Sequence, residues 1–290
     1  MTASYIAEPA FLAEDPHKLA KTDLTKCTLL MNVGPALLMF AVYEPQNKYL
    51  ITLKGYFFDI HDQEGSLLET LEQCFDQNRI LYTAFQDIKI SFDNHEFTLI
   101  PDELYDPSLK KEYLTFLHPE SAGQSFQTDR IEFLNAVNVY AVDKNTAGYL
   151  RKEFGSAKFY HAETAFLSSV MQEADNAATR LYVRVQQGHI TITVIVEGKL
   201  KLVQPYPIYH GMDVYYFVLN TVKSLHLNDR HVEVFLSGQI NEESSVYKEL
   251  IYGIPSVSWL KRPKNITYSR DFNKYPDQYF YILASLAQCE

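Results

Sequence analysis

The sequence predicts an α/β protein made of two similar halves, each with a mixed sheet flanked by helices. A group of three strands joined by short turns occurs twice, once in residues 29–58 and again in residues 181–208. Each group is followed by alternating strands and helices, an order that favours crossover connections and parallel strand pairing. With 290 residues, of which 47% are hydrophobic, the chain can bury a core in both halves.

The first strand group begins with an apolar stretch, residues 29–43, that contains a turn at Gly34-Pro35. Residues 45–47, Pro-Gln-Asn, supply a second turn, and residues 49–58 are again apolar. Val, Leu, Tyr and Phe dominate both stretches, and these residue types pack well on a pleated surface. The pattern predicts strand, turn, strand, hairpin and strand.

The remaining elements of the first half follow from helical spacing of apolar residues or from short apolar runs between turn residues. In chain order they are a helix in 66–77, two short strands in 86–97, a helix in 106–116, a strand in 132–142, a helix in 144–154, a strand in 158–161 and a helix in 162–173. Residues 119–130 show no periodicity, and we predict a polar loop there.

The second strand group contains the hairpin turn Glu197-Gly-Lys199. The elements predicted after it are a helix in 211–225, a strand in 231–237, a helix in 242–251, a strand in 256–260 and a closing helix in 277–287. This order repeats that of the first half.

No flexible linker or low-complexity tract separates the two halves. We therefore predict a polar N-terminal leader (1–25), a first lobe (26–178) with an inserted subdomain at about 78–130, and a second lobe (179–290).

The charge of the chain excludes two classes of partner. The net charge is −10, and no basic stripe offsets it. Such a chain binds nucleic acid and anionic lipid poorly. No window approaches the 18 or more apolar residues of a membrane span.

The cysteines indicate the compartment. Cys27, Cys74 and Cys289 are odd in number and far apart, which predicts reduced thiols and a cytoplasmic location. Cys27 is expected to be a small core residue, whereas Cys289, near the chain end, is expected to be exposed.

Three turn segments carry the candidate site residues. Asn32-Val-Gly34 forms the first turn of the first strand group. Arg184-Val-Gln186, with Gly188 two residues later, forms the corresponding turn of the second group. Gly238 ends a predicted buried strand just before a helix.

This duplicated order of elements resembles the ribonuclease-H-like halves of the actin-like ATPase superfamily, which includes actin, the 70-kDa chaperones, sugar kinases and FtsA. The chain looks closest to a family of uncharacterised bacterial proteins with this fold, and it is also similar to PilM and to the cytoplasmic part of GspL. The resemblance spans about residues 27–288 and implies two lobes with a nucleotide cleft between them.

The resemblance also shows what this chain lacks. Family members carry Asp-x-Gly in both turns, where this sequence has Asn32 and Gly34, and Arg184 and Gln186. The adenosine-binding turn of the family has a pair of glycines, of which only Gly238 is present. Mg²⁺ requires carboxylates or waters held by them, and phosphates require close backbone amides. We therefore predict that ATP and Mg²⁺ are not cofactors.

Other chemistry is also absent from the pattern. His161 and Glu163 end a predicted strand and could face each other, but such spacing is common, and we interpret the histidine as structural. No Walker loop, dinucleotide fingerprint or nucleophile elbow occurs. We predict no catalytic residue and no metal site.

Two functions remain open. The first is a non-catalytic actin-like scaffold that binds an unidentified protein partner, with self-association also allowed. Tyr206, Tyr209, Tyr215 and Tyr216 would then contribute to a contact surface, although ordinary packing of the second lobe is the favoured explanation for these tyrosines. The second is a diverged enzyme or sensor that binds a nucleotide or another anion in the interlobe cleft.

Overall fold

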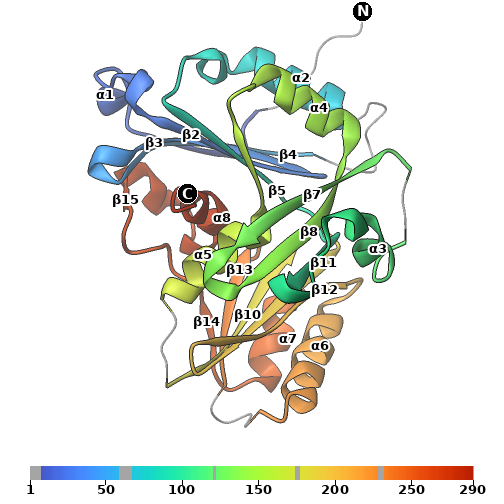
Figure 1. Cartoon of the computed structure of the whole chain (residues 1–290). Coiled ribbons are helices and arrows are strands. Elements are labelled where there is room, and N and C mark those ends of the chain that lie inside the picture. Colours follow the sequence, from blue (N-terminus) through green and yellow to red (C-terminus); the bar gives the residue numbers. More distant parts are fainter. Residues whose placement is uncertain (1–7, 59–66, 120–121, 174–176, 228–231, 290) are drawn as a thin grey trace, which may run out of the picture.

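Two sheets with the same strand order form the frame of the molecule (Figure 1). A computed structural model describes residues 8–58, 67–119, 122–173, 177–227 and 232–289. The shared order is β4-β3-β2-β5-β9 in the first sheet and β12-β11-β10-β13-β14 in the second. Within each of these two sets of five strands, the first three strands along the chain pair antiparallel, and the other two pair in parallel.

The elements of the first lobe match most of the predicted ones. Its sheet consists of β1 (Phe11–Glu14), β2 (Thr28–Gly34), β3 (Leu37–Glu44), β4 (Tyr49–Phe57), β5 (Asp87–Phe92), β9 (Lys158–His161) and β15 (Thr267–Tyr268). Its helices are α1 (Pro16–Leu19), α2 (Leu67–Gln77), α4 (Lys144–Glu153) and α5 (Ala162–Gln172).

The second lobe repeats this arrangement. Its sheet consists of β10 (Thr179–Gln186), β11 (His189–Val196), β12 (Lys199–Pro207), β13 (Val232–Gly238) and β14 (Val257–Trp259), with helices α6 (Gly211–Ser224), α7 (Ser245–Gly253) and α8 (Tyr281–Leu286). Short 3-10 helices occur at Leu24–Lys26, Pro45–Asn47, Arg79–Tyr82, Asp102–Leu104, Pro107–Leu109, Glu132–Leu134, Arg270–Lys274 and Asp277–Phe280.

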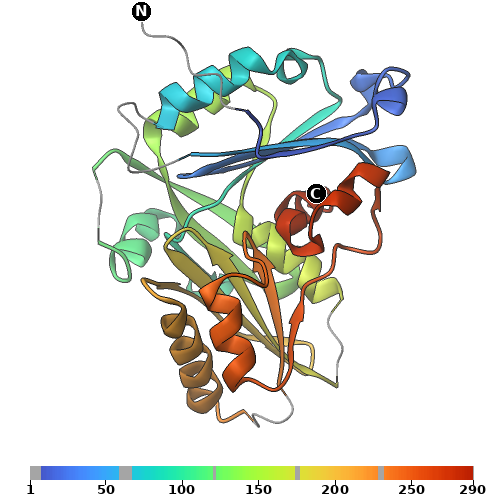
Figure 2. The ribbon, with the colours of Figure 1, turned by 180° about the vertical axis from the view of Figure 1, so that it is seen from behind.

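The sheets and helices alternate in layers, as the view from behind shows (Figure 2). Helices α2 and α4 cover one face of the first sheet, and α6 and α7 cover the outer face of the second. Between the sheets lie α5 and α8. Ala165 and Leu283 of these helices pack against the first sheet, whereas Phe166 and Ile282 pack against the second. Burial of apolar side chains on both sides of these two helices therefore joins the lobes.

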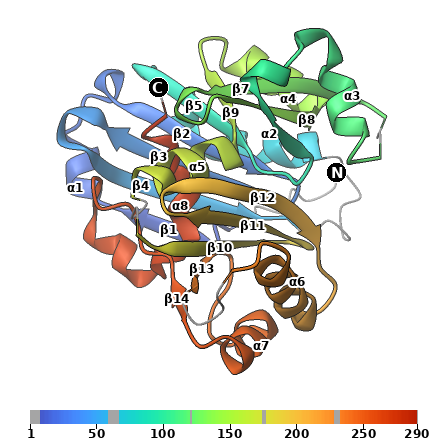
Figure 3. The same ribbon diagram turned by 60° about the horizontal axis from the view of Figure 1, so that its bottom comes forward.

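A third, smaller sheet projects from the first lobe (Figure 3). It has the order β6-β8-β7, formed by Phe97–Pro101, Ala136–Asp143 and Gln124–Ile131, and α3 (Lys110–Thr115) packs on it. The two strands predicted in 86–97 thus belong to different sheets. The domain boundaries given above remain a prediction.

Three features differ from the sequence-based expectations. Residues 124–131 form strand β7 rather than a loop, because this edge strand pairs along its whole length with β8 and needs no apolar alternation. Strand β1 lies within the predicted leader and pairs with β4, where the Phe11 ring is buried among Phe57, Tyr275 and Phe280. The end of the chain returns to the first sheet, where β15 pairs with β4.

The structure also tests the predictions made for the three cysteines and for membrane-spanning segments. Cys27 and Cys74 are buried and unpaired as expected. Cys289 is also buried, contrary to the expected exposure, because α8 carries the chain end into the core shared with the first sheet. Within the described ranges, no helix is long and apolar enough to cross a membrane.

Gly238 provides a test of the local geometry. Its φ is +96°, and a Cβ at this position would overlap the carbonyl oxygen of Val185 on the neighbouring strand. Gly238→Ala should therefore destabilise the protein by more than about 2 kcal/mol, measured by urea denaturation. Gly148→Ala is the matched control. Apart from the nearby backbone of α4 and the adjoining residues, no described atom lies within 4 Å of a Cβ added at Gly148, which is within α4.

The two substitutions should have opposite signs, because alanine is the better residue in a helix interior by about 0.5–1 kcal/mol. A neutral Gly238→Ala variant would contradict the described end of β13.

Candidate functional site

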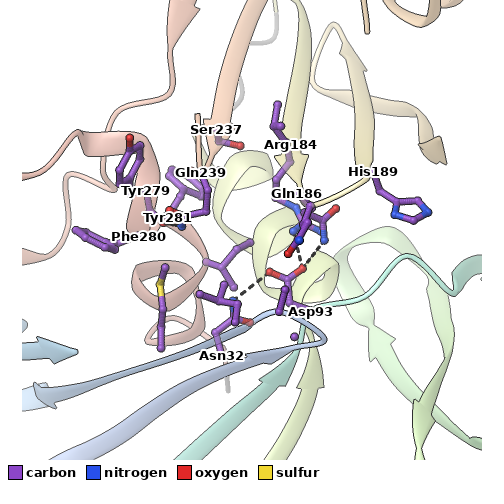
Figure 4. A pocket seen from close by; sticks show the side chains of 18 of the residues that line it. Asn32, Asp93, Arg184, Gln186, His189, Ser237, Gln239, Tyr279, Phe280 and Tyr281 are labelled. Atoms are coloured by element: carbon purple, nitrogen blue, oxygen red, sulfur yellow. Dashed lines mark hydrogen bonds and ion pairs between the residues drawn. The ribbon is translucent and has the colours of Figure 1, made fainter. Parts of the chain in front are cut away.

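A cleft of about 440 Å³ lies where the strand ends of the two lobes meet. The β2–β3 turn, the β10–β11 turn, the end of β13 and the segment 278–283 line it (Figure 4). In both lobes the lining thus comes from the first hairpin turn of the strand group, as the resemblance implied. A volume of this size is typical of small-molecule sites.

The structure brings together most of the candidate residues named from the sequence. Of these candidates, the ones that line the cleft are Asn32, Gly34, Arg184, Gln186 and Gly238. Gly188 lies in the same β10–β11 turn with a φ of +72° but is not among the lining residues. Glycine adopts this positive φ without steric cost, which allows the tight turn.

Asn32 and Arg184 occupy equivalent positions in the two lobes. In the first hairpin Gly34 pairs with Leu37, and in the second Gln186 pairs with His189. Asn32 and Arg184 each lie two residues before these closing pairs. The alignment counted from the sequence therefore places an amide and a guanidinium at matching points of the frame.

The guanidinium of Arg184 is buried between two carboxylates. Its Nη1 donates to Oδ1 of Asp93 at 2.7 Å, and its Nη2 donates to Oε2 of Glu163 at 2.9 Å. Its Nε also donates to Oε2 of Glu163, at 3.3 Å. The side chain of Arg184 is only 3% exposed. All three nitrogens of the group are thus engaged within the protein.

Asp93 is the residue that sequence reasoning missed. It follows β5 directly, and its backbone N–H donates to the carbonyl of Val33 at 2.8 Å, which holds it beside the first turn. Its Oδ1 also accepts from Nε2 of Gln186 at 2.6 Å, and its Oδ2 accepts from Nδ2 of Asn32 at 3.1 Å. One carboxylate therefore binds side chains from both turns.

Glu163 and His161 complete the network from the first turn of α5 and the end of β9. Oε1 of Glu163 accepts from the hydroxyl of Thr193 at 3.2 Å. The ring of His161 is fully buried, with Nδ1 accepting from the backbone N–H of Glu163 and Nε2 lying 3.2 Å from the carbonyl of Asn94. Both bonds fit a neutral imidazole that carries its proton on Nε2, which supports the structural role predicted for His161.

The pKa values separate the three titratable groups. Burial raises the pKa of Asp93, but the charge and hydrogen bonds of Arg184 and the bond from Asn32 outweigh it, so that the pKa lies below its usual value. Burial raises the pKa of Glu163, and Arg184 and Thr193 offset this only in part. Burial, together with the charge of Arg184, lowers the pKa of His161 to about 3. Arg184 thus lowers the pKa of both carboxylates and counteracts the effect of their burial.

Two further histidines, His95 and His189, line the cleft and contact each other. The rings of His95 and His189 stack with their centroids 3.7 Å apart. Burial and the neighbouring His189 and His118 lower the pKa of His95 to about 4, and burial also lowers the pKa of His189. Both rings are thus neutral near pH 7.

The two positions that carry aspartates in the actin-like family hold no carboxylate in this chain. Asn32 offers a neutral oxygen, and that oxygen already accepts from the hydroxyl of Ser91 at 2.8 Å. Arg184 brings positive charge to the second aspartate position. In the part of the chain that the structure describes, no group of three His, Cys, Asp or Glu side chains could hold a metal ion.

The family and the fold are established by comparison with known proteins. Residues 16–254 match the model of a family described as "Protein of unknown function (DUF3822)", and the chain belongs to this family. No curated protein matches the sequence.

Two solved structures share the fold. A protein of unknown function from Bacteroides thetaiotaomicron with an actin-like ATPase fold superimposes with a TM-score of 0.78 at 20% identity, over 92% of this chain and 97% of that chain. The PilM–PilN type IV pilus biogenesis complex contains a chain that superimposes with a TM-score of 0.60 at 11% identity, over 92% of this chain and 98% of that chain. The resemblance to uncharacterised actin-like proteins and the predicted fold class are confirmed.

The network predicts a large stability cost when its cation is removed. Arg184→Met leaves two buried carboxylates without their positive partner, which should cost about 3–5 kcal/mol in the free energy of unfolding. Arg180→Met is the matched control, because Arg180 lies on the same strand and pairs with the half-exposed Glu233. That exposed pair should contribute less than about 1 kcal/mol. Urea denaturation followed by circular dichroism measures both.

Adding Glu163→Gln to Arg184→Met should recover part of the loss, since it removes one uncompensated charge. Equal costs for Arg184→Met and Arg180→Met would contradict the described network.

Proposed function

We propose that this protein is a non-catalytic binding module of the actin-like ATPase fold that acts by contacting a protein partner. We infer the lack of catalysis from the Arg184 guanidinium in the cleft, which forms ion pairs with both Asp93 and Glu163. Phosphoryl transfer depends on a metal ion and on cations that reach the transferred phosphate. Here the central cation is neutralised internally.

An exposed surface on the second lobe supports the binding of a protein partner. Five large side chains on or beside α6 and α7 are exposed, and we call them the α6–α7 surface: Tyr209, Met212, Tyr216, Ile251 and Tyr252. Their exposed fractions range from 47% for Ile251 to 93% for Tyr252. Figures 1 and 3 show the two helices side by side on the outside of the second sheet. Exposed aromatic and Met side chains on neighbouring helices are typical of protein interfaces.

The tyrosines named from the sequence divide between surface and packing. Tyr209 and Tyr216 belong to the α6–α7 surface, whereas Tyr206 stacks on Phe217 with centroids 4.4 Å apart. Tyr215 lies so close to Gly253 of α7 that a side chain at that glycine would overlap its ring. Tyr206 thus packs on α6 and Tyr215 packs on α7, whereas Tyr209 and Tyr216 are exposed.

The structural similarity to a chain of the PilM–PilN complex also favours partner binding, because that chain is part of a protein complex. A nucleotide or anion sensor is the second candidate. It is less favoured, since an anion in the cleft would have to compete with Asp93 and Glu163 for Arg184.

Site-specific crosslinking in the native host tests the proposal. p-Benzoylphenylalanine in place of Tyr252 or Tyr216 should give one covalent adduct of defined mass on irradiation, because these rings would lie in the partner interface. The matched control is the same replacement at Phe116, which is 88% exposed but lies next to α3, away from the α6–α7 surface.

An adduct at Tyr252 and Tyr216 that is absent at Phe116 is the expected result. No adduct, or the same adducts at all three positions, would contradict the proposal. An adduct with the mass of two copies of this chain would assign the surface to self-association and contradict a separate partner.

A further inference from the structure

The cleft has an apolar wall that the Arg184 network does not explain. Pro35, Leu37, Phe57, Tyr279 and Phe280 line this part of the cleft, and the rings of Phe57, Tyr279 and Phe280 all pack around Phe11. Phe57 is 47% exposed although its ring lies 5.2 Å from that of Phe11 in an aromatic cluster. Aromatic rings around an open volume favour binding of a flat apolar molecule.

The two charged side chains that line the cleft form an ion pair with each other. Among the described lining residues, Arg184 and Asp93 are the only Arg, Lys, Asp or Glu side chains, and they bind each other. His95 and His189, which also line the cleft, are stacked together. An anionic ligand would therefore lose its hydration without gaining a free cation, which is unfavourable.

Two polar atoms at the end of β13 have no hydrogen-bond partner among the described residues. They are Oγ of Ser237, a residue that is 1% exposed, and Oε1 of Gln239. The Gln239 amide is held in place because its Nε2 donates to the carbonyl of Tyr279 at 3.2 Å. Both residues line the cleft, on either side of Gly238. Buried polar atoms are seldom left unpaired, so these two mark where a ligand's polar group would bind.

We propose that the cleft binds an uncharged, mainly apolar small molecule with a single polar end. Its apolar body lies against Phe57 and Tyr279, and its polar end exchanges hydrogen bonds with Ser237 and Gln239. A hydroxyl or amide suits these atoms, because Ser237 can both donate and accept while Oε1 of Gln239 accepts. The proposal goes beyond partner binding through the α6–α7 surface and does not depend on it.

Two fluorescent probes of nearly the same shape test this ligand class. N-phenyl-1-naphthylamine is neutral and has one N–H donor, and 8-anilinonaphthalene-1-sulfonate adds only a sulfonate. The neutral probe should bind the intact protein saturably at one site, and the sulfonate probe should bind at least about tenfold more weakly because no cation is free to receive it.

Variants locate the binding. Phe57→Ser should weaken the neutral probe about tenfold by removing an aromatic contact, and Gln239→Leu should weaken it about threefold by removing the acceptor. Tyr252→Ser, on the α6–α7 surface, is the matched control and should leave the affinity unchanged. Circular dichroism confirms that each variant is folded, and Gln239→Leu provides the test should Phe57→Ser unfold.

Tighter or equal binding of the sulfonate probe would overturn the proposal, because the cleft would then hold a usable cation. Equal affinity of the neutral probe for the wild type, Phe57→Ser and Gln239→Leu would overturn it as well, since the probe would then bind elsewhere. Neither outcome affects the crosslinking result expected at Tyr252.

Discussion

The ion pair between Arg184 and Asp93, extended to Glu163, is the interaction on which the cleft depends. Arg184 belongs to β10 of the second lobe, whereas Asp93 and Glu163 belong to the first. The pair therefore links the two lobes at the cleft. Because all three side chains are buried, each relies on the others for the hydration it has lost. The same contacts hold the two hairpin turns against each other, through Gln186 and Asn32.

The duplicated frame explains how this arrangement can exist without loss of the fold. Strand pairing uses backbone groups, so that the β2–β3 and β10–β11 hairpins keep the same register with an amide at one equivalent position and a guanidinium at the other. What changes is the charge that the turns present to the cleft. An actin-like frame of this kind retains its interlobe volume and its outer helices, which are the two features that the proposed ligand and the proposed partner would use.

The sequence predicted much of this frame and part of the site. Strand periodicity and turn residues located both hairpins, and the two turn segments predicted that Arg184 occupies the position equivalent to Asn32. The sequence alone could not identify the counter-ions of Arg184. Asp93 stands 91 residues before Arg184, and it looked like a turn residue until the packing of the lobes brought it to the guanidinium. Glu163 was noticed only as a neighbour of His161. Strand β7 was missed because an edge strand with polar side chains leaves no periodic signal.

Titration of the purified protein with ATP and ADP, with and without Mg²⁺, would show whether the cleft binds a metal nucleotide while Asp93 and Glu163 hold Arg184. A nucleotide at 100 times its Kd would stabilise the folded state by about 2.7 kcal/mol and raise Tm by several degrees. With Arg184 closed by Asp93 and Glu163, the account predicts a change in Tm below about 1 °C at about 5 mM nucleotide, with or without the metal. A rise of several degrees that requires Mg²⁺ would show that the cleft still binds the metal nucleotide and would contradict the account.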